Sequence, residues 1–240
     1  EKTQGSKDPG SFTGKTMGNG GSEGREAATG RGGVIVLAEY LKAQGLLDKP
    51  LTVALQGYGN VGQFFAQVLH ELYPNLKIVA VANSKHTWLL PDGLNPRTTD
   101  LNTLTDAAQL PRDAIITADA DILVLAALEN AVNIGNAASV KAKIIVELAN
   151  GPVTKDAETV LLSVNKHILP DIVANAGGVI VSYLEWQQNL KHEHWSEAEV
   201  NRQLADILVP PTQQMLARAG AEQISYKQAA FELALIRLLG

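Results

Sequence analysis

The stretch "LTVALQGYGNVGQFFAQVLHEL" at residues 51–72 places three glycines between a short apolar run and a helical pattern. Gly57, Gly59 and Gly62 have the spacing GxGxxG. In such a turn the first glycine permits a tight bend, the second lets the backbone approach a pyrophosphate, and the third lets helix and strand pack closely. A second apolar run, "KIVAVA", follows the helical pattern. This order predicts a dinucleotide-binding β-α-β unit rather than a glycine-rich turn without a ligand.

Later apolar runs define the rest of the sheet. "ADILVLAA", "AKIIVELA" and "KHILP" recur between short helical stretches, and they are continuous rather than alternating, which is typical of strands buried on both faces. The pattern predicts an α/β fold with a doubly wound, Rossmann-like and mostly parallel sheet. Extra C-terminal helices are expected over residues 191–240, with a helix break at Pro210 and Pro211.

Composition indicates the domain organisation and excludes some classes of partner. Residues 1–24 are rich in Gly, Ser, Thr and Lys without apolar periodicity, so we expect a linker or loop, followed by one NAD(P)-binding domain over 25–240. The net charge of −5 argues against nucleic acid or an anionic membrane surface as partner. The absence of cysteine agrees with a cytoplasmic location. Because the sequence begins with Glu rather than Met, we expect a piece of a longer chain.

The end of the second predicted strand bears on cofactor choice. An acidic residue about 20 positions after the glycines usually accepts the ribose 2′-hydroxyl and repels a 2′-phosphate. Here "VAVANSKH" offers Asn83, followed by Ser84 and Lys85. A neutral amide beside a hydroxyl and a cation favours NADP, or both cofactors. The alternative is that Asn83 binds the ribose of NAD while Lys85 and His86 are solvated.

Metal binding is not predicted from this sequence. His192 and His194 flank Glu193 in "KHEHW", but residues two apart on a helix point away from each other, and no third ligand pattern lies nearby.

Six segments in order carry a family resemblance: "GGSEGREAATGRGG", "QGYGNVG", "DILVLAALEN", "VELANGP", "VANAGGVIVSYLEWQQN" and "KQAAFELALIRL". Together they resemble the C-terminal, nucleotide-binding domain of the glutamate/leucine/phenylalanine/valine dehydrogenases, and are most similar to the hexameric glutamate dehydrogenases. The resemblance runs from about residue 10 to 240.

The resemblance implies roles for particular residues. Arg25 and Thr29 would face the nicotinamide, and their spacing of four would put both on one helical face. Further cofactor contacts are implied for Asn60 and Val61 in the glycine turn, Ala126 and Ala127 under the ribose, Asn150 beside the nicotinamide ribose, and Asn175 near the carboxamide.

The apolar stretch "NAGGVIVSYLEW" also carries the expected substrate contact. If it is helical, Asn175, Gly178 and Ser182 share one face. The resemblance implies that Ser182 binds the distal carboxylate of glutamate, whereas a leucine or phenylalanine dehydrogenase would not be expected to have "VSYLEW" here. The alternative is a glycine seam for helix packing, with Ser182 bonded back to its own helix.

The implied reaction is the reversible oxidative deamination of L-glutamate to 2-oxoglutarate and ammonia, with NAD(P)⁺ as hydride acceptor, in a homohexamer. The family's catalytic lysine and aspartate belong to a preceding substrate domain, and neither motif occurs here. Lys15, in "TGKTMG", lacks that context, so no catalytic residue is expected in this chain. The alternatives are a stand-alone dinucleotide-binding regulatory module and another amino acid dehydrogenase.

Overall fold

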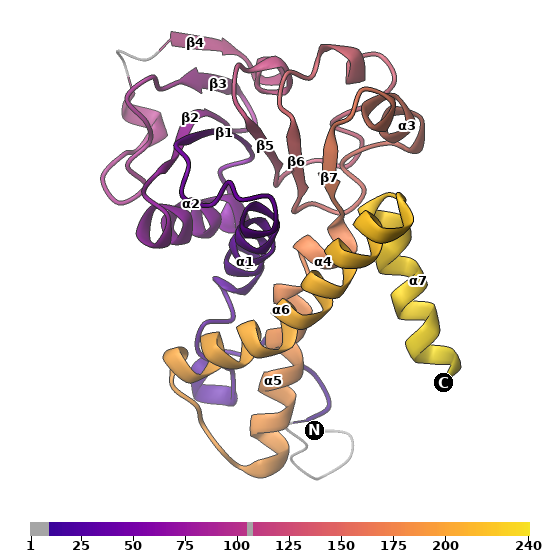
Figure 1. Ribbon diagram of the computed structural model, residues 1–240. Helices are drawn as coiled ribbons and strands as arrows, with labels where there is room; N and C mark the ends of the chain where they lie inside the picture. Colours follow the sequence, from indigo (N-terminus) through magenta and orange to yellow (C-terminus); the bar gives the residue numbers. More distant parts are fainter. Residues whose placement is uncertain (1–9, 105–107) are drawn as a thin grey trace.

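One sheet organises the molecule. The computed structural model describes residues 10–104 and 108–240, so residues 1–9 of the expected linker lie outside the described residues. Within these ranges the strands are β1 (Leu51–Gln56), β2 (Leu76–Ala82), β3 (His86–Leu89), β4 (Ala108–Pro111), β5 (Ile122–Leu125), β6 (Ile144–Glu147) and β7 (His167–Leu169). They form one sheet in the order β4-β3-β2-β1-β5-β6-β7 (Figure 1). β3 and β4 are antiparallel additions to a parallel sheet, which confirms the predicted fold class.

Helices cover the sheet and extend beyond it. They are α1 (Ala28–Ala43), α2 (Asn60–Leu72), α3 (Lys155–Ser163), α4 (Asp171–Ala174), α5 (Gly177–Lys191), α6 (Glu197–Glu222) and α7 (Tyr226–Leu239), with 3-10 turns η1 (Met17–Asn19), η2 (Leu101–Thr103), η3 (Arg112–Thr117) and η4 (Ala137–Ser139). Three of them begin at hydroxyl caps, because Thr154, Ser196 and Ser225 each accept a hydrogen bond from a first-turn N–H. None of the described helices combines the length and apolar composition needed to cross a bilayer.

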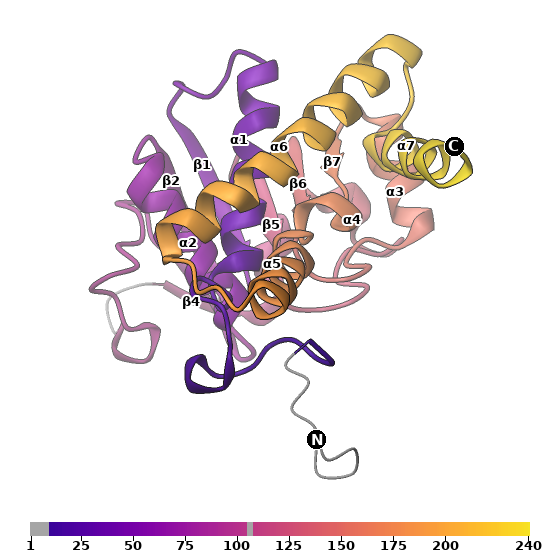
Figure 2. The same ribbon diagram turned by 90° about the horizontal axis from the view of Figure 1, so that it is seen from below.

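The strands are buried on both faces, as their continuous apolar runs indicate. Val53 and Leu55 of β1 face one core, which includes α1, α2 and α6, while Ala54 faces a second core with α3, η3 and η4. Figure 2 shows α6 running across α1 on one side of the sheet. Because side chains alternate along a strand, consecutive apolar residues in the middle of each parallel strand fill both cores.

The strand order creates a switch point beside β1. The chain passes from β1 to β2 on one side, and it later returns to β5 on the other side. The end of β1 is held to the residue that follows β5, since the backbone N–H of Ala126 donates to the carbonyl of Gln56 at 2.8 Å. Ligands of open α/β sheets bind where the connections diverge in this way. The glycine turn after β1 lies at this position.

The expected helix break at Pro210 and Pro211 is wrong, because α6 continues through both prolines. Each proline removes one helical N–H donor, which leaves the carbonyls of Asp206 and Ile207 without helical partners. Both of these residues are exposed, so water can bond those carbonyls. The opposite face of α6 is buried, and this packing outweighs the lost bonds; its buried residues are Val200, Leu204, Leu208, Thr212, Met215 and Ala219.

Candidate cofactor and substrate site

The three glycines of the turn after β1 meet different steric demands. Gly57 has φ +94°, and an added Cβ there would lie 2.6 Å from Cβ of Ala127. A Cβ on Gly62 would lie 1.9 Å from the carbonyl oxygen of Gly57. Both positions therefore require glycine for the fold itself. Gly59 differs, because its φ of −85° is ordinary and an added Cβ would meet no protein atom within 4 Å.

The N-terminus of α2 opens onto the same space. Gly59 is its N-cap and provides no side chain to bond the first-turn N–H groups. Those groups have no intrahelical partner, and together with the helix dipole they favour an anion. Asn60 ties this end of α2 to the turn before α1, since its Nδ2 donates to the carbonyl of Glu26 at 3.2 Å, while Val61 packs against the core. The residues present therefore fit the pyrophosphate of a dinucleotide.

A cavity of about 350 Å³ lies beside this turn, at the carboxyl ends of β1 and β2. Its lining residues are Gln56, Gly57, Tyr58, Gly59, Asn83, Ser84, Arg112, Ala127 and Leu128. Five of these were predicted from sequence, and Ala126 lies next to them, half-buried. Lys85 is exposed and does not line the cavity, whereas Arg112, which the sequence did not indicate, does.

Asn83 shapes the turn between β2 and β3. Its Oδ1 accepts from the backbone N–H groups of Lys85, at 2.7 Å, and His86, at 3.0 Å. The side chain thus uses its carbonyl oxygen for the turn, and its amide NH₂ is the group that remains as a donor toward the cavity. An aspartate here would keep both turn bonds, and it would replace the amide donor with a negatively charged acceptor.

At the other end of the site, Asn150 and Asn175 come together. Nδ2 of Asn175 donates to Oδ1 of Asn150 at 2.8 Å. Asn175 lies in the break between α4 and α5, so the expectation that it shares a helical face with Gly178 and Ser182 is wrong. The break accompanies close packing on α1, where a Cβ on Gly177 would lie 2.1 Å from the carbonyl oxygen of Ala28. Gly177 therefore allows the close packing of α5 on α1.

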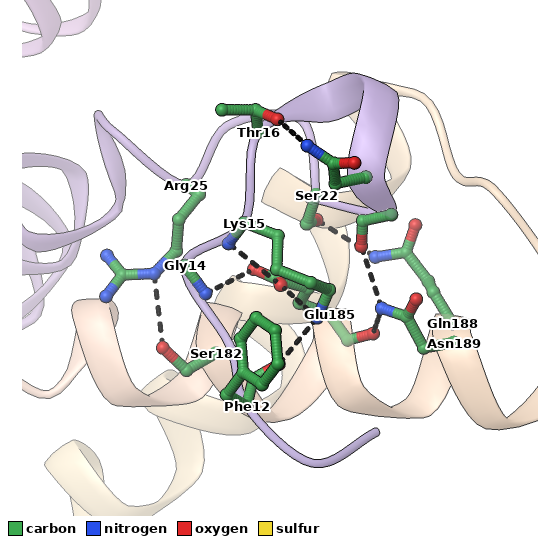
Figure 3. A network of polar contacts seen from close by, with 12 residues as sticks. Phe12, Gly14, Lys15, Thr16, Ser22, Arg25, Ser182, Glu185, Gln188 and Asn189 are labelled. Atoms are coloured by element: carbon green, nitrogen blue, oxygen red, sulfur yellow. Dashed lines mark hydrogen bonds and ion pairs between the residues drawn. The ribbon is translucent and has the colours of Figure 1, made fainter. Parts of the chain in front are cut away.

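Arg25 and Thr29 also converge, although not through helical spacing. Arg25 lies in a turn before α1 begins, so the predicted shared helical face is wrong. The two side chains nevertheless meet at Gly178, where an added Cβ would lie 2.6 Å from Oγ1 of Thr29 and 3.8 Å from Nη1 of Arg25. Nε of Arg25 donates to Oγ of Ser182 at 3.1 Å (Figure 3). The bond that the structure records for the Ser182 hydroxyl thus leads to Arg25 and not back into α5.

The N-terminal segment is held along α5 by a buried ion pair. The side chain of Glu185 is fully buried and lies 2.8 Å from Nζ of Lys15. The same carboxylate accepts from the backbone N–H groups of Gly14 at 3.0 Å and Lys15 at 3.3 Å (Figure 3). Farther along, Nε2 of Gln188 donates to Oγ of Ser22 at 2.9 Å. Lys15 therefore forms a structural ion pair, and we assign it no catalytic role.

A second buried carboxyl supports the loop that carries Asn150. Glu147 ends β6 with 1% of its surface exposed, and its Oε2 accepts from the backbone N–H of Asp171 at 3.1 Å. Oδ2 of Asp171 in turn accepts from the backbone N–H of Gly151 at 2.9 Å. Burial raises the pKa of Glu147 to about 7, although the Asp171 N–H and the charge of Lys227 oppose the shift.

This pKa predicts a loss of stability as pH rises. Between 4.5, the ordinary pKa of a glutamate, and about 7, the unfolded chain loses the Glu147 proton while the folded chain keeps it. The free energy of unfolding should fall across this window by roughly 3 kcal/mol. Glu147→Gln should remove that fall, which urea unfolding at about pH 5 and about pH 8 would measure. Glu71→Gln, at an exposed site, is the control, and equal slopes for wild type and Glu147→Gln would contradict the prediction.

Comparison with known proteins identifies the family. The family model described as Glutamate/Leucine/Phenylalanine/Valine dehydrogenase matches residues 20–239. The chain belongs to this family. The resemblance to the family's C-terminal domain is thereby confirmed, and the match includes the glycine turn, Arg25 and α5.

Individual dehydrogenases of the family are similar over nearly the whole chain. The NADP-specific glutamate dehydrogenase A1 of Halobacterium salinarum is 39% identical, over 96% of this chain and 57% of that protein. The catabolic NAD-specific glutamate dehydrogenase RocG of Bacillus subtilis is 36% identical, over 93% of this chain and 54% of that protein. A solved hetero-hexameric glutamate dehydrogenase from Thermus thermophilus superposes with a TM-score of 0.88 at 35% identity, over 99% of this chain and 57% of that one. The chain spans about half the length of the relatives it matches.

Proposed function

We propose that this chain is the cofactor-binding half of an NAD(P)-dependent glutamate dehydrogenase. The complete protein would convert L-glutamate, NAD(P)⁺ and water to 2-oxoglutarate, ammonia and NAD(P)H. The observation that carries this proposal is the Arg25–Ser182 pair, which joins the turn before α1 to α5, the helix that follows the break holding Asn175. The names of the relatives, one NADP-specific and one NAD-specific, support either cofactor.

The proposed cofactor contacts follow from the site geometry. The nicotinamide, when bound, accepts the hydride from the α-carbon of the amino acid. The first turn of α2 would hold the pyrophosphate, because its N–H groups lack helical partners and Gly59 leaves open space in front of them. Asn83 and Ser84 would bind the adenosine ribose from the cavity wall. The remaining contacts are assigned to Arg25, Thr29, Gly57, Asn60, Val61, Gly62, Ala126, Ala127, Asn150 and Asn175.

The Arg25–Ser182 pair favours a dicarboxylic substrate. A guanidinium is a bidentate carboxylate partner, and a hydroxyl that accepts from it keeps its own O–H as a donor. Ser182 accepts from Nε of Arg25, so both groups can donate to one carboxylate. An apolar side chain such as that of leucine would leave these polar groups unpaired, which selects against it. Glutamate is therefore the proposed substrate, with the catalytic lysine and aspartate supplied from outside this chain.

The organisation of the complete protein is proposed on the same basis. Residues 25–240 would form the cofactor domain, and residues 1–24 would connect it to the substrate domain. A hexamer is supported by the hetero-hexameric neighbour. The homohexamer and the cytoplasmic location stay predictions.

Calorimetric titration of this chain with NADP⁺ and with NAD⁺ tests the cofactor assignment. We expect binding, and we expect Asn83→Asp to weaken NADP⁺ at least about tenfold more than NAD⁺, because the new carboxylate repels a 2′-phosphate. The variant keeps the acceptor for the two turn bonds, so its melting temperature should match the wild type. Absence of binding by both cofactors at millimolar concentration would contradict the proposal.

A further inference from the structure

We propose that Arg112 determines cofactor specificity by binding the 2′-phosphate of NADP. The inference rests on the proposed dinucleotide site, and it assigns the cationic role to Arg112 instead of Lys85. Arg112 begins η3 directly after β4, about 30 residues beyond the position where the Rossmann pattern locates this contact.

The antiparallel edge of the sheet brings Arg112 to the cavity. β3 returns beside β2, pairing Thr87 with Ala82, and β4 returns beside β3, pairing Pro111 with His86. The residue after Pro111 is thereby placed near the turn that carries Asn83. The buried Oγ1 of Thr87 donates to the backbone carbonyl of Arg112 at 2.8 Å, which fixes the starting point of the side chain.

The charge of the cavity depends on this one side chain. Among the described residues that line the cavity, Arg112 is the only one with a formal charge. The carboxylate that would repel a 2′-phosphate is absent from the end of β2, where Asn83 offers an amide. Arg112 lines the same cavity as two neutral donors, Asn83 and Ser84, and this set of residues suits a phosphate monoester.

The local contacts of Arg112 leave its terminal nitrogens as donors. Its Nε donates to Oδ1 of Asp113 at 3.0 Å, and among the described residues this is the hydrogen bond that its side chain makes. The Asp113 side chain is 77% exposed and does not line the cavity, so it orients the guanidinium from the solvent side. By contrast, the backbone N–H of Lys85 serves the Asn83 turn and its side chain lies outside the cavity lining.

Matched alanine variants test the assignment on this chain. Arg112→Ala should weaken NADP⁺ at least about tenfold and NAD⁺ by less than about twofold, whereas Lys85→Ala should leave both within about twofold, by calorimetry at fixed salt. The same contrast should appear with the fragments 2′,5′-ADP and 5′-AMP, which report the adenosine end alone. Arg112→Lys should fall between wild type and Arg112→Ala, because a point charge replaces a bidentate fork.

Several outcomes would overturn the proposal. Equal losses for the two cofactors in Arg112→Ala, or an unchanged ratio, would remove Arg112 from specificity. A selective loss of NADP⁺ in Lys85→Ala would return the role to Lys85. Because the Arg112 side chain is half-exposed and pairs with Asp113, its variants should have the same melting temperature as the wild type. If the wild-type chain bound neither cofactor, the proposed function itself would fail. If it bound both and Arg112→Ala left their ratio unchanged, only the assignment of Arg112 would fail.

Discussion

Replacing Lys15 with methionine should destabilise the folded chain by about 3–5 kcal/mol, because it leaves a charge buried without its counter-ion. The side chains of Lys15 and Glu185 are 5% and 0% exposed, and their charged atoms lie 2.8 Å apart. The carboxylate still accepts hydrogen bonds from the backbone N–H groups of residues 14 and 15, and these only partly compensate for the lost counter-ion. Urea unfolding monitored by circular dichroism measures the change.

The chain contains a matched control for this prediction. Arg97 and Glu71 form an exposed pair at 3.6 Å, with side chains 65% and 56% exposed. Arg97→Met should change stability by less than about 1 kcal/mol. Adding Glu185→Gln to Lys15→Met should recover part of the loss, since the amide removes the buried charge and its oxygen still accepts one of the two N–H bonds. A small effect of Lys15→Met, with unchanged amide exchange at residues 14–22, would contradict the prediction.

The sequence predicted the parts of the site that short-range sterics determine. Gly62 is required because a Cβ would strike the carbonyl of Gly57 within the same turn, and Gly57 has a positive φ, so their spacing alone indicates the turn. Strand burial was equally readable, because continuous apolar runs are needed between two cores. Helical spacing was less reliable at helix ends. Arg25 lies just before α1, and Asn175 lies in a break between helices, although both reach the site.

Long-range partners could not be predicted from one sequence. Lys15 and Glu185 are 170 positions apart, and nothing in "TGKTMG" indicates a buried carboxylate as its partner. Arg112 reaches the cavity only because β3 and β4 fold back on the sheet edge. Glu147 reads as part of an apolar strand, and its role depends on the N-terminus of α4. In each case the partner depends on tertiary packing, which leaves no periodic signal in the sequence.

Alanine at Gly62 should lower the stability of the fold strongly, whereas alanine at Gly59 should leave it nearly unchanged. Gly62→Ala places a methyl 1.9 Å from the carbonyl oxygen of Gly57, so α2 must move away from β1, and a loss of about 3 kcal/mol or more in stability is expected. Gly59→Ala meets open space at an ordinary φ, so its stability should stay within about 1 kcal/mol of the wild type. Thermal unfolding by circular dichroism measures both changes.

Cofactor affinity, unlike stability, should fall in Gly59→Ala. In Gly59→Ala the added methyl projects into the space assigned to the pyrophosphate, in front of the first turn of α2. A folded protein with NADP⁺ and NAD⁺ affinities both reduced at least about tenfold is therefore expected, since the pyrophosphate is common to both. This uniform loss contrasts with the selective loss expected for Arg112→Ala. Normal affinity in a folded Gly59→Ala variant would show that the pyrophosphate does not approach this glycine, and the cofactor would then have to be placed elsewhere along the switch point.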